Sequence, residues 1–374
     1  MFRLAYRPTR RAQSRRDRRI PARSSAVRRR AAVITPVLPA SPESIRRAAA
    51  IIQRGGLVAF PTETVYGLGA NATDAEAVAR IFTAKDRPLT DPVIVHIAKA
   101  ADLDSVARDL PPAAHVLTAA FMPGALTLVL RRAARIPALV AAGGETVAVR
   151  MPSHPVAQAL IRDSGVPIAA PSANTFSRPS ATTAAHVLED LDGRIDLILD
   201  GGAATIGVES TILDLTVAPP TILRPGGIPV EAIRALLPDV QVAARYLGVE
   251  TAAAAPGQML RHYSPRAALA LYTGTDDDAT LARMRADIAA AQAAGRRVGI
   301  LVSDDAAHLT AALTADLGTA LEVVSARLFA ALRDLDAQGV DLIVVRWTRR
   351  EGLGAAIWDR LVRASNGRVI VVKP

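Results

Sequence analysis

Segments with helical spacing and short apolar runs alternate along the chain, and this alternation constrains the fold more than any other feature. Residues 73–84 begin with a residue type that caps helices and then place apolar side chains on one helix face. Residues 92–97 and 125–130 are short runs typical of buried strands. Alternating strands and helices predict an α/β protein, with helices packed on the faces of a sheet.

The pattern divides the chain into an extension (1–40), a first α/β domain (41–235), a linker without sustained periodicity (236–266) and a smaller, Rossmann-like α/β domain (267–374). In the first domain we expect strands at 57–60, 92–97, 125–130, 146–150, 166–171, 196–200, 210–215 and 221–224, and helices at 43–54, 73–84, 112–121, 155–163 and 183–190. In the second domain we expect parallel strands at 268–274, 297–304, 321–326, 341–347 and 368–374, and helices at 279–294, between 304 and 321, at 326–337 and at 353–364.

The net charge of +10 is concentrated in the extension. Residues 1–30 contain twelve arginines and one acidic residue, so the rest of the chain is nearly neutral. We expect residues 1–40 to be disordered. A basic arm that attracts RNA and an organellar transit peptide are alternatives, because the segment is rich in arginine and poor in acids. No apolar run approaches the roughly 20 residues that span a bilayer, so we expect no membrane association.

Several kinds of site are excluded by what the chain lacks. It has no cysteine, and therefore no disulfide, thiolate nucleophile or cysteine-bound metal. It contains neither a G-x-x-x-x-G-K-[ST] phosphate loop nor a G-x-S-x-G nucleophile elbow, and the pair Gly67 and Gly69 lacks the third glycine of a dinucleotide site. Its six histidines show no metal-ligand spacing, so we expect no metal held by the protein alone.

Polar residues instead collect at the ends of predicted strands, where binding sites commonly form. Residues 61–71 (PTETVYGLGAN) follow a buried strand and offer hydroxyls, a carboxylate and glycines, although a simple turn is the alternative. Lys85 and Arg87 lie two residues apart after a helix. This pair is suited to clamping phosphate oxygens, or only to capping the helix.

Two strands carry polar groups on one face. Alternation in residues 92–97 places Ile94 and His96 on the same face, and the alternative is a histidine satisfied in the core. Thr146 and Arg150 share a face of their strand. Arg150 ends the strand in a position to bind a carboxylate, unless it is a solvated charge at an edge.

Three further clusters combine small hydroxyl residues, glycine and arginine at strand ends. They are Ser172–Asn174 with Arg178–Ser180, Val208–Thr211, and Arg224–Gly227, in which the glycine N–H groups are free to bind an anion. One such cluster is weak evidence for a site. Five in one domain indicate a polar binding pocket.

These motifs together resemble the YrdC-like threonylcarbamoyl-AMP synthases in their two-domain form, over residues 43–374. The motifs that carry the resemblance are VAFPTETVYGLGA, KDRP, PVIVHI, FMPGALTLVL, VAVRMPSHP, PIAAPSANTFSRPSATTAAHV, LILDGG, GVESTILDL, LRPGGI, APGQMLRHYSP and GLGAAIWDRLVRAS. The resemblance implies a twisted open sheet with helices and a second, smaller domain that covers the site or anchors the linker.

The resemblance also implies an activity. Members of this family condense L-threonine, bicarbonate and ATP, with Mg²⁺, into threonylcarbamoyl-AMP and pyrophosphate. A partner transferase then modifies the adenosine beside the anticodon of tRNAs that read ANN codons. We therefore expect a cytoplasmic nucleotidyltransferase with a weak tRNA contact. The alternative in another class is a non-catalytic, RNA-binding or regulatory member of the fold.

Matching positions imply the site residues. Those implied for threonine are Thr64, His96, Arg150 and Ser210. Those implied for ATP are Arg87, Asp91, Thr146, Ala170, Ser172, Asn174, Ser180, Arg224, His262 and Tyr263. Lys85, Arg87 and Arg150 are implied in catalysis. The chain departs from the family at Asp91, where asparagine is common, and a carboxylate there would repel a triphosphate unless Mg²⁺ or Arg87 intervenes.

Overall fold

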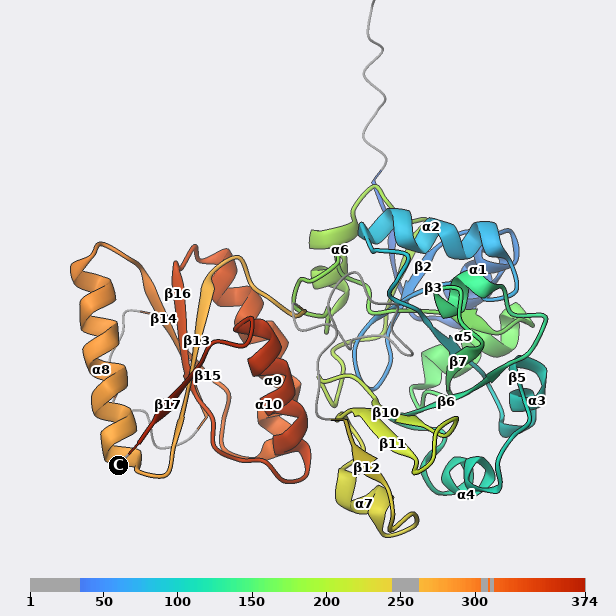
Figure 1. Cartoon of the computed structure of the whole chain (residues 1–374). Coiled ribbons are helices and arrows are strands. Elements are labelled where there is room, and N and C mark those ends of the chain that lie inside the picture. The colour runs from blue at the N-terminus through green and yellow to red at the C-terminus, as the bar shows by residue number, and fades with distance from the viewer. Residues whose placement is uncertain (1–33, 244–261, 304–308, 310–312, 374) are drawn as a thin grey trace, which may run out of the picture. The chain divides into compact units, whose positions relative to one another are not determined.

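The computed structural model of the chain describes residues 34–243, 262–303, 309 and 313–373. Within these residues, twelve strands form one mixed sheet and five strands form a second, parallel sheet, each flanked by helices (Figure 1). The large sheet has the order β1-β9-β2-β3-β8-β4-β7-β6-β10-β11-β12, and β5 pairs with β6 beside this path. The small sheet has the order β15-β14-β16-β13-β17. Both sheets confirm the predicted α/β class.

The strands of the large sheet are β1 (Val37–Pro39), β2 (Val58–Phe60), β3 (Gly67–Asn71), β4 (Ile94–His96), β5 (Ala107–Arg108), β6 (Leu126–Arg132), β7 (Thr146–Arg150), β8 (Ile168–Ala169), β9 (Leu197–Asp200), β10 (Thr211–Asp214), β11 (Thr221–Arg224) and β12 (Gln241–Val242). The helices around it are α1 (Pro42–Gln53), α2 (Ala75–Lys85), α3 (Leu103–Val106), α4 (Pro112–Phe121), α5 (Pro155–Ser164), α6 (Ala184–Leu191) and α7 (Val230–Arg234), with 3₁₀ turns at Ala100–Asp102 and Ala138–Ala141.

Capping signals in the sequence set the helix ends. The Ser41 hydroxyl accepts a hydrogen bond from the N–H of Ser44 at 3.2 Å, and α1 then begins with proline. Asp74 caps α2 by accepting bonds from its first turn. This helix ends at Asp86, whose φ of 55° is left-handed. The turn that follows carries Arg87 toward the pocket described below.

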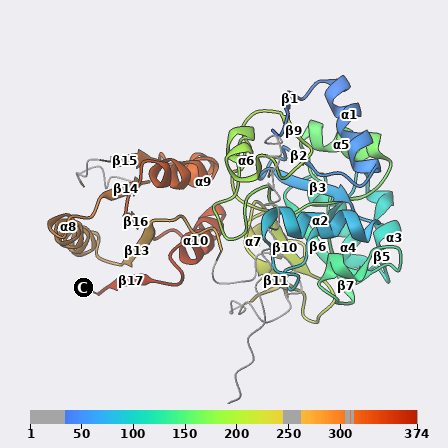
Figure 2. The same ribbon diagram turned by 90° about the horizontal axis from the view of Figure 1, so that it is seen from above.

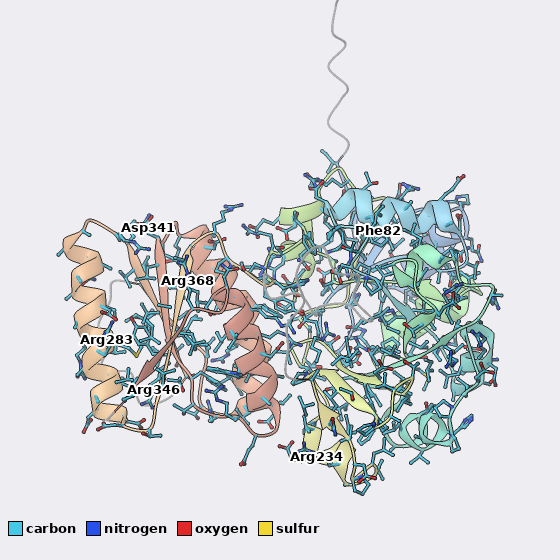
Figure 3. The ribbon with its side chains drawn as sticks, in the orientation of Figure 1. Phe82, Arg234, Arg283, Asp341, Arg346 and Arg368 are labelled. Atoms are coloured by element: carbon cyan, nitrogen blue, oxygen red, sulfur yellow. The ribbon has the colours of Figure 1, made fainter. Side chains whose placement is uncertain are left out.

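Apolar layers cover both faces of the large sheet. The larger layer includes Phe82 from α2 (Figure 3), Val95 from β4 and the neighbouring residues Val93 and Ile97. A second layer lies between the sheet and the packed pair α1 and α5. Because Val93, Val95 and Ile97 lie in the larger layer, the residues that alternate with them face the other way, which confirms the predicted polar face of this strand.

The small sheet consists of β13 (Ala268–Gly274), β14 (Val298–Val302), β15 (Leu313–Asp316), β16 (Leu342–Arg346) and β17 (Val369–Val372), and all of its pairings are parallel. The helices are α8 (Asp277–Ala293), α9 (Leu321–Ala337) and α10 (Leu353–Ala364). Helix α8 covers one face, and α9 and α10 cover the other (Figure 2). On the outer side of α8, Arg283 pairs with Asp287 at 2.8 Å and stays at the surface (Figure 3).

Four strands lie where the sequence predicts none, one of them the short β5, which pairs with β6. β1 pairs with β9 and Thr35 is buried with hydrogen bonds to Asp192 and Ile195, so the expectation of a disordered extension through residue 40 is wrong for residues 34–40. β3 pairs with β2 and β8, although its glycines suggested a loop. β12 pairs with β11 inside the predicted linker. Residues 1–33 lie outside the described residues, so the rest of the extension stays a prediction.

The second domain contains two errors of type. Residues 321–326, predicted as a strand, form the first turns of α9. Residues 313–316, predicted within a helix, form β15 on the edge of the sheet. The apolar run at 321–326 packs one side of a helix against the sheet, and a run this short does not distinguish a strand from a buried helix segment. Among the described helices, none is long and apolar enough to cross a membrane.

Candidate active site

A pocket opens where β4, β7 and β11 end, beside the chain that leads into β3 and β10. Nine of the residues predicted for the site contribute to its wall: Arg87, His96, Arg150, Ala170, Ser172, Ser210, Arg224, His262 and Tyr263. The other residues of the wall are Thr62, Val65, Tyr66, Gly67, Ile94, Pro171 and Glu209. Predicted positions that lie up to 176 residues apart in the sequence, from Arg87 to Tyr263, therefore meet in one place.

Arg150 ends β7 and is almost fully buried. Its Nη2 donates a hydrogen bond to Oε1 of Glu63 at 2.6 Å, and its Nε donates to the carbonyl oxygen of Gly124 at 3.3 Å. Burial opposes ionisation of Glu63, but the charge and hydrogen bond of Arg150 outweigh it, so the pKa of Glu63 is lowered. The pair is therefore ionised, and Arg150 presents a guanidinium to the pocket.

His96 lies at the end of β4 with its ring edge-on to Phe60, 6.3 Å between ring centroids. Burial lowers the pKa of His96 to about 3, and the neighbouring charge of Arg150 adds to this shift. The imidazole is neutral at physiological pH. It can donate or accept a hydrogen bond in the pocket but adds no charge.

Burial of His96 makes the free energy of unfolding depend on pH. Between pH 6.5 and about 3 the unfolded chain binds a proton at His96 that the folded chain does not bind, so the free energy of unfolding falls as the pH falls through this window. We expect His96→Gln to reduce that slope by up to about 1.4 kcal/mol per pH unit. Urea denaturation at several pH values between 4 and 6.5 measures it, and parallel curves for the two proteins would contradict the assignment.

Arg87 and Asp91 form a buried ion pair, with 2.9 Å between Nη2 and Oδ2. Arg87 also donates to the carbonyl oxygens of Asp91 and Pro92. Asp91 was predicted to face the nucleotide, but it is not part of the pocket wall, and its side chain is fully buried against Arg87. The repulsion expected between this carboxylate and a triphosphate is thereby offset by Arg87.

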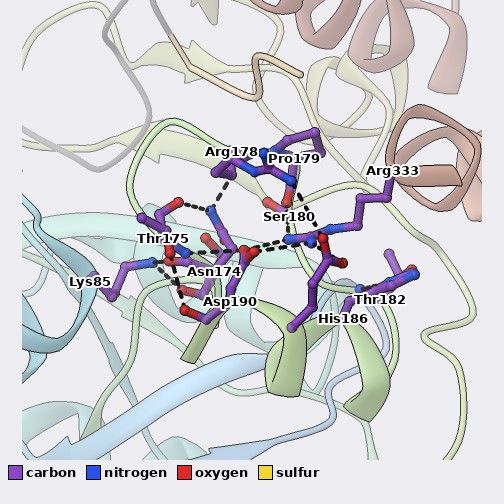
Figure 4. Close-up of polar contacts among 12 residues, drawn as sticks. Lys85, Asn174, Thr175, Arg178, Pro179, Ser180, Thr182, His186, Asp190 and Arg333 are labelled. Carbon is purple, nitrogen blue, oxygen red and sulfur yellow. Dashed lines mark hydrogen bonds and ion pairs between the residues drawn. The ribbon is translucent and has the colours of Figure 1, made fainter. Parts of the chain in front are cut away.

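Lys85 also lies behind the pocket wall rather than in it. Its ammonium donates to the carbonyl oxygens of Ser172 and Asn174, so it ties the end of α2 to the segment that follows β8 (Figure 4). Burial, followed by the charge of Arg87, lowers the pKa of Lys85 well below its ordinary value. Lys85, implied in catalysis, therefore supports the segment that carries Ser172, whereas Arg87, Arg150 and Arg224 line the pocket.

Ser210 and Arg224 bring β10 and β11 into the site. The Ser210 hydroxyl lies 2.7 Å from that of Thr127, and its carbonyl oxygen accepts from Nη2 of Arg224 at 2.9 Å. Nη1 of Arg224 donates to the hydroxyl of Tyr263 at 3.5 Å. Burial lowers the pKa of Arg224, but an arginine stays protonated in a protein.

Gly226 allows this close approach. A Cβ there would lie 2.3 Å from the carbonyl carbon of Ser210 and 2.4 Å from the carbonyl oxygen of Glu209. We expect Gly226→Ala to cost at least about 1–3 kcal/mol and to lower activity, because backbone must move and Ser210 moves with it. Thermal unfolding and turnover measure both effects. Gly144→Ala, whose Cβ would meet a carbonyl at 3.1 Å, is the milder control, and equal behaviour of the two variants would refute the prediction.

Glu209 is a pocket residue that sequence reasoning missed. Its Oε1 accepts from the Ser180 hydroxyl at 2.5 Å, and its Oε2 accepts from Nε of Arg360, on α10, at 2.6 Å. Burial raises the pKa of Glu209, but Arg360 and Arg224 outweigh it and the pKa is lowered. The strand-end cluster Val208–Thr211 was the available signal, but its distant partner Arg360 was not predictable from spacing.

Helix α9 of the small domain also contacts the large domain. Nη2 of Arg333, on α9, donates to Oδ2 of Asp190 at 2.7 Å and to the carbonyl oxygen of Pro179 at 2.7 Å (Figure 4). Gly207 lies directly against α9, because a Cβ there would be 2.3 Å from the carbonyl oxygen of Ser325. Buried charges and backbone packing therefore join α9 to the segments that precede β10.

His262 and Tyr263 form one wall of the pocket. The His262 ring packs edge-on against Phe176 and Tyr263, and Tyr263 packs against Phe329 of α9 at 5.3 Å. Burial, followed by the charge of Arg87, lowers the pKa of His262 well below its ordinary value. The end of the predicted linker therefore reaches the pocket, and both aromatic side chains are neutral there.

Four other predicted residues lie outside the pocket wall. Thr64 is buried with its hydroxyl 2.8 Å from that of Thr62, which does line the pocket. Asn174 donates to the carbonyl oxygens of Thr175 and Arg178 and shapes the loop after Ser172 (Figure 4). Ser180 acts through Glu209. Thr146 begins β7, at the opposite end of that strand from Arg150, so sharing a face does not bring the two side chains together.

Comparison with known proteins agrees with this geometry. Residues 50–226 match the Sua5, YciO and YrdC family model, described as telomere recombination, and residues 228–366 match the C-terminal domain of threonylcarbamoyl-AMP synthase. The chain is 46% identical to the threonylcarbamoyl-AMP synthase of Pyrococcus abyssi over 88% of this chain and 96% of the relative. It is 44% identical to that of Bacillus subtilis over 90% and 97%. The crystal structure of P. abyssi Sua5 complexed with L-threonine has a TM-score of 0.85 and 43% identity, covering 91% of this chain and 99% of that one.

Proposed function

The chain belongs to the threonylcarbamoyl-AMP synthase family, and from this premise we propose how its pocket carries out the reaction. The chain is an enzyme, a transferase that forms threonylcarbamoyl-AMP, and L-threonine and ATP are its substrates. The non-catalytic reading is not favoured by these relatives. The observation that carries the proposed site is the convergence of Arg87, Arg150 and Arg224 on one pocket beside a neutral His96.

In this proposal Arg150, His96 and Ser210 bind L-threonine. Arg150 is supported by its ionised pairing with Glu63 and its exposure to the pocket, since a guanidinium binds a carboxylate well. The hydroxyl of Ser210 and the neutral ring of His96 supply hydrogen bonds without further charge. Thr64 contributes through Thr62.

ATP binds on the side of the pocket formed by Arg87, Ser172, Arg224 and the aromatic pair His262 and Tyr263. Two arginines match the charge of a triphosphate, and the hydroxyl of Ser172 adds a donor. The small side chain of Ala170 leaves room for the nucleotide. Four residues outside the wall support this side: Asp91, Asn174, Ser180 and Lys85. The assignment of Thr146 to the ATP site rests on the family resemblance alone.

We propose bicarbonate as the third substrate. The amine of threonine forms a bond to the carbon of bicarbonate, water leaves, and an oxygen of the resulting carbamate attacks the α-phosphorus of ATP with loss of pyrophosphate. No covalent nucleophile on the protein is needed for these steps. Arg87, Arg150 and Arg224 position the anions and stabilise the charge that develops.

Mg²⁺ enters this proposal with ATP. Within the described part of the chain there is no group of three histidine or acidic side chains that could hold a metal ion. The carboxylates of Asp91 and Glu209 are already paired with Arg87 and Arg360. The triphosphate oxygens are therefore the ligands we propose for Mg²⁺.

We further propose that the product is passed to a threonylcarbamoyl transferase that modifies ANN-reading tRNA, with a weak tRNA contact and a cytoplasmic location. These proposals rest on the family alone.

The test of the proposed function uses the purified full chain with ATP, Mg²⁺, L-threonine and labelled bicarbonate. Pyrophosphate release should require all four, and acid-stable label should appear with it. Release that is independent of threonine or bicarbonate would overturn the proposed reaction. Omission of Mg²⁺ should abolish turnover, and full turnover without a divalent cation would refute its proposed role.

A further inference from the structure

Glu63 is a buried acid that lies next to the pocket but not in its wall. We propose that Glu63 is the positioning residue that orients Arg150 toward the carboxylate of L-threonine. This inference rests on the proposed function, which places that carboxylate at Arg150. Glu63 acts through Arg150 and does not touch the substrate.

The hydrogen bonds of Arg150 are arranged on one edge of its guanidinium. Nη2 donates to Oε1 of Glu63 at 2.6 Å, and Nε donates to Gly124 at 3.3 Å, so the protein occupies the edge formed by these two nitrogens. Within the described residues, Nη1 has no hydrogen-bond partner, and Arg150 lines the pocket. The edge that includes Nη1 is thus left for a ligand.

Glu63 is itself held in place from several directions. Its Oε2 accepts from the N–H of Ser153 at 3.1 Å, on the turn between β7 and α5. Its own carbonyl oxygen accepts from the N–H of Ile206 at 2.7 Å, so its backbone is tied to the segment before β10. The carboxylate therefore has one orientation available, and through it the guanidinium of Arg150 has one too.

This arrangement matters because recognition of a carboxylate by arginine depends on the direction of its N–H groups. Without Glu63, Arg150 keeps its charge but loses the partner that fixes its plane. A misplacement of about 1 Å can lower a rate up to about 100-fold. The loss should fall on threonine and not on ATP, whose proposed contacts lie on the other side of the pocket.

The experiment compares Glu63→Ala, Glu63→Gln and Arg150→Ala in the full chain. We expect Glu63→Ala to raise the KM for L-threonine by roughly 10- to 100-fold and to leave the KM for ATP within about threefold. Glu63→Gln, which keeps one acceptor oxygen, should recover part of the loss. Glu145→Ala is the matched control, because Glu145 precedes the other end of β7 and is itself exposed where it pairs with Arg108 and Arg132, and it should behave as the unsubstituted protein.

A double substitution separates positioning from a general structural role. If Glu63 acts through Arg150, Glu63→Ala adds little once Arg150 is alanine, whereas independent roles would add. Thermal unfolding with ATP checks that each variant still folds and binds nucleotide. Additive losses, or equal losses for threonine and ATP, would overturn the inference about Glu63. An Arg150→Ala variant with unchanged threonine KM would instead overturn the proposed threonine site.

Discussion

Replacing Arg224 with alanine should lower kcat/KM for ATP by roughly 10- to 150-fold, the equivalent of a charge-assisted hydrogen bond worth about 1.5–3 kcal/mol. Arg224 is buried at the end of β11, lines the pocket and is held against Ser210 and Tyr263. A guanidinium fixed in this way loses little entropy when it binds a phosphate. Steady-state rates of pyrophosphate release at varied ATP measure the effect.

The control for this variant is Arg131→Ala, which removes an exposed arginine from β6 outside the pocket wall. Its kinetics should be unchanged within about twofold, since it lies outside the site. Circular dichroism and thermal unfolding establish that the Arg224 variant is folded. A folded Arg224 variant with unchanged kcat/KM would refute the assignment of this residue to the phosphate side.

Replacing Asp91 with leucine should lower the free energy of unfolding by about 3–5 kcal/mol. Both side chains of the Arg87–Asp91 pair are buried, and their charged atoms are 2.9 Å apart. Leucine leaves the guanidinium in the interior without this carboxylate, which is costly because the charge has already lost its water. Urea denaturation with linear extrapolation measures the loss.

Two comparisons make this prediction specific. Asp91→Asn keeps an acceptor for Arg87 and leaves a net positive charge there, so it should cost less stability and keep or improve activity. Asp102→Leu removes the partly exposed partner of Lys99, a contact of 3.8 Å, and a hydrogen bond from the Lys99 N–H at 3.1 Å, and should cost less, about 0–2 kcal/mol. If the leucine variants at 91 and 102 lose equal stability, burial of the Arg87–Asp91 pair does not explain the loss.

Short-range sequence patterns predicted much of the fold and part of the site. Alternation placed Ile94 and His96 on one face of β4, and both line the pocket. The same rule put Thr146 and Arg150 on one face, but only Arg150 reaches the pocket. A period-two rule reports which face a side chain points to and nothing about how far along the strand the pocket extends.

Contacts between distant segments account for what the sequence did not reveal. Glu209 and Arg360 are separated by 151 residues, and no local spacing relates them. Lys85 was chosen for its charge beside Arg87, yet its ammonium is satisfied by the carbonyl oxygens of Ser172 and Asn174. Whether a cation faces a ligand or its own backbone is decided by tertiary packing, and composition does not contain that information.

Contacts between distant segments also explain why β3 and the start of α9 were not predicted. Residues 61–71 were predicted as a polar cluster or a turn, but Gly67 and Gly69 belong to β3, and Phe60 and Ile168 lie so close to Gly69 that a Cβ would be 2.8 Å from each. Glycine at this position allows the side chains of Phe60 and Ile168 to approach the backbone closely. Residues 321–326 contain two valines, which favour strands. In α9, Leu321 and Val324 pack in the apolar layer of the small domain, and this packing overrides the local preference.

The ion pair between Glu209 and Arg360 has an evolutionary consequence. The carboxylate stands in the wall of the pocket, and the arginine that neutralises it belongs to a different domain. A lineage that exchanged its C-terminal domain for one without a cation at this point of α10 would lose the ion pair of Glu209 and keep only its contacts within the first domain. In this chain, a substitution at Arg360 therefore changes the electrostatics of the pocket even though Arg360 lies in the other domain.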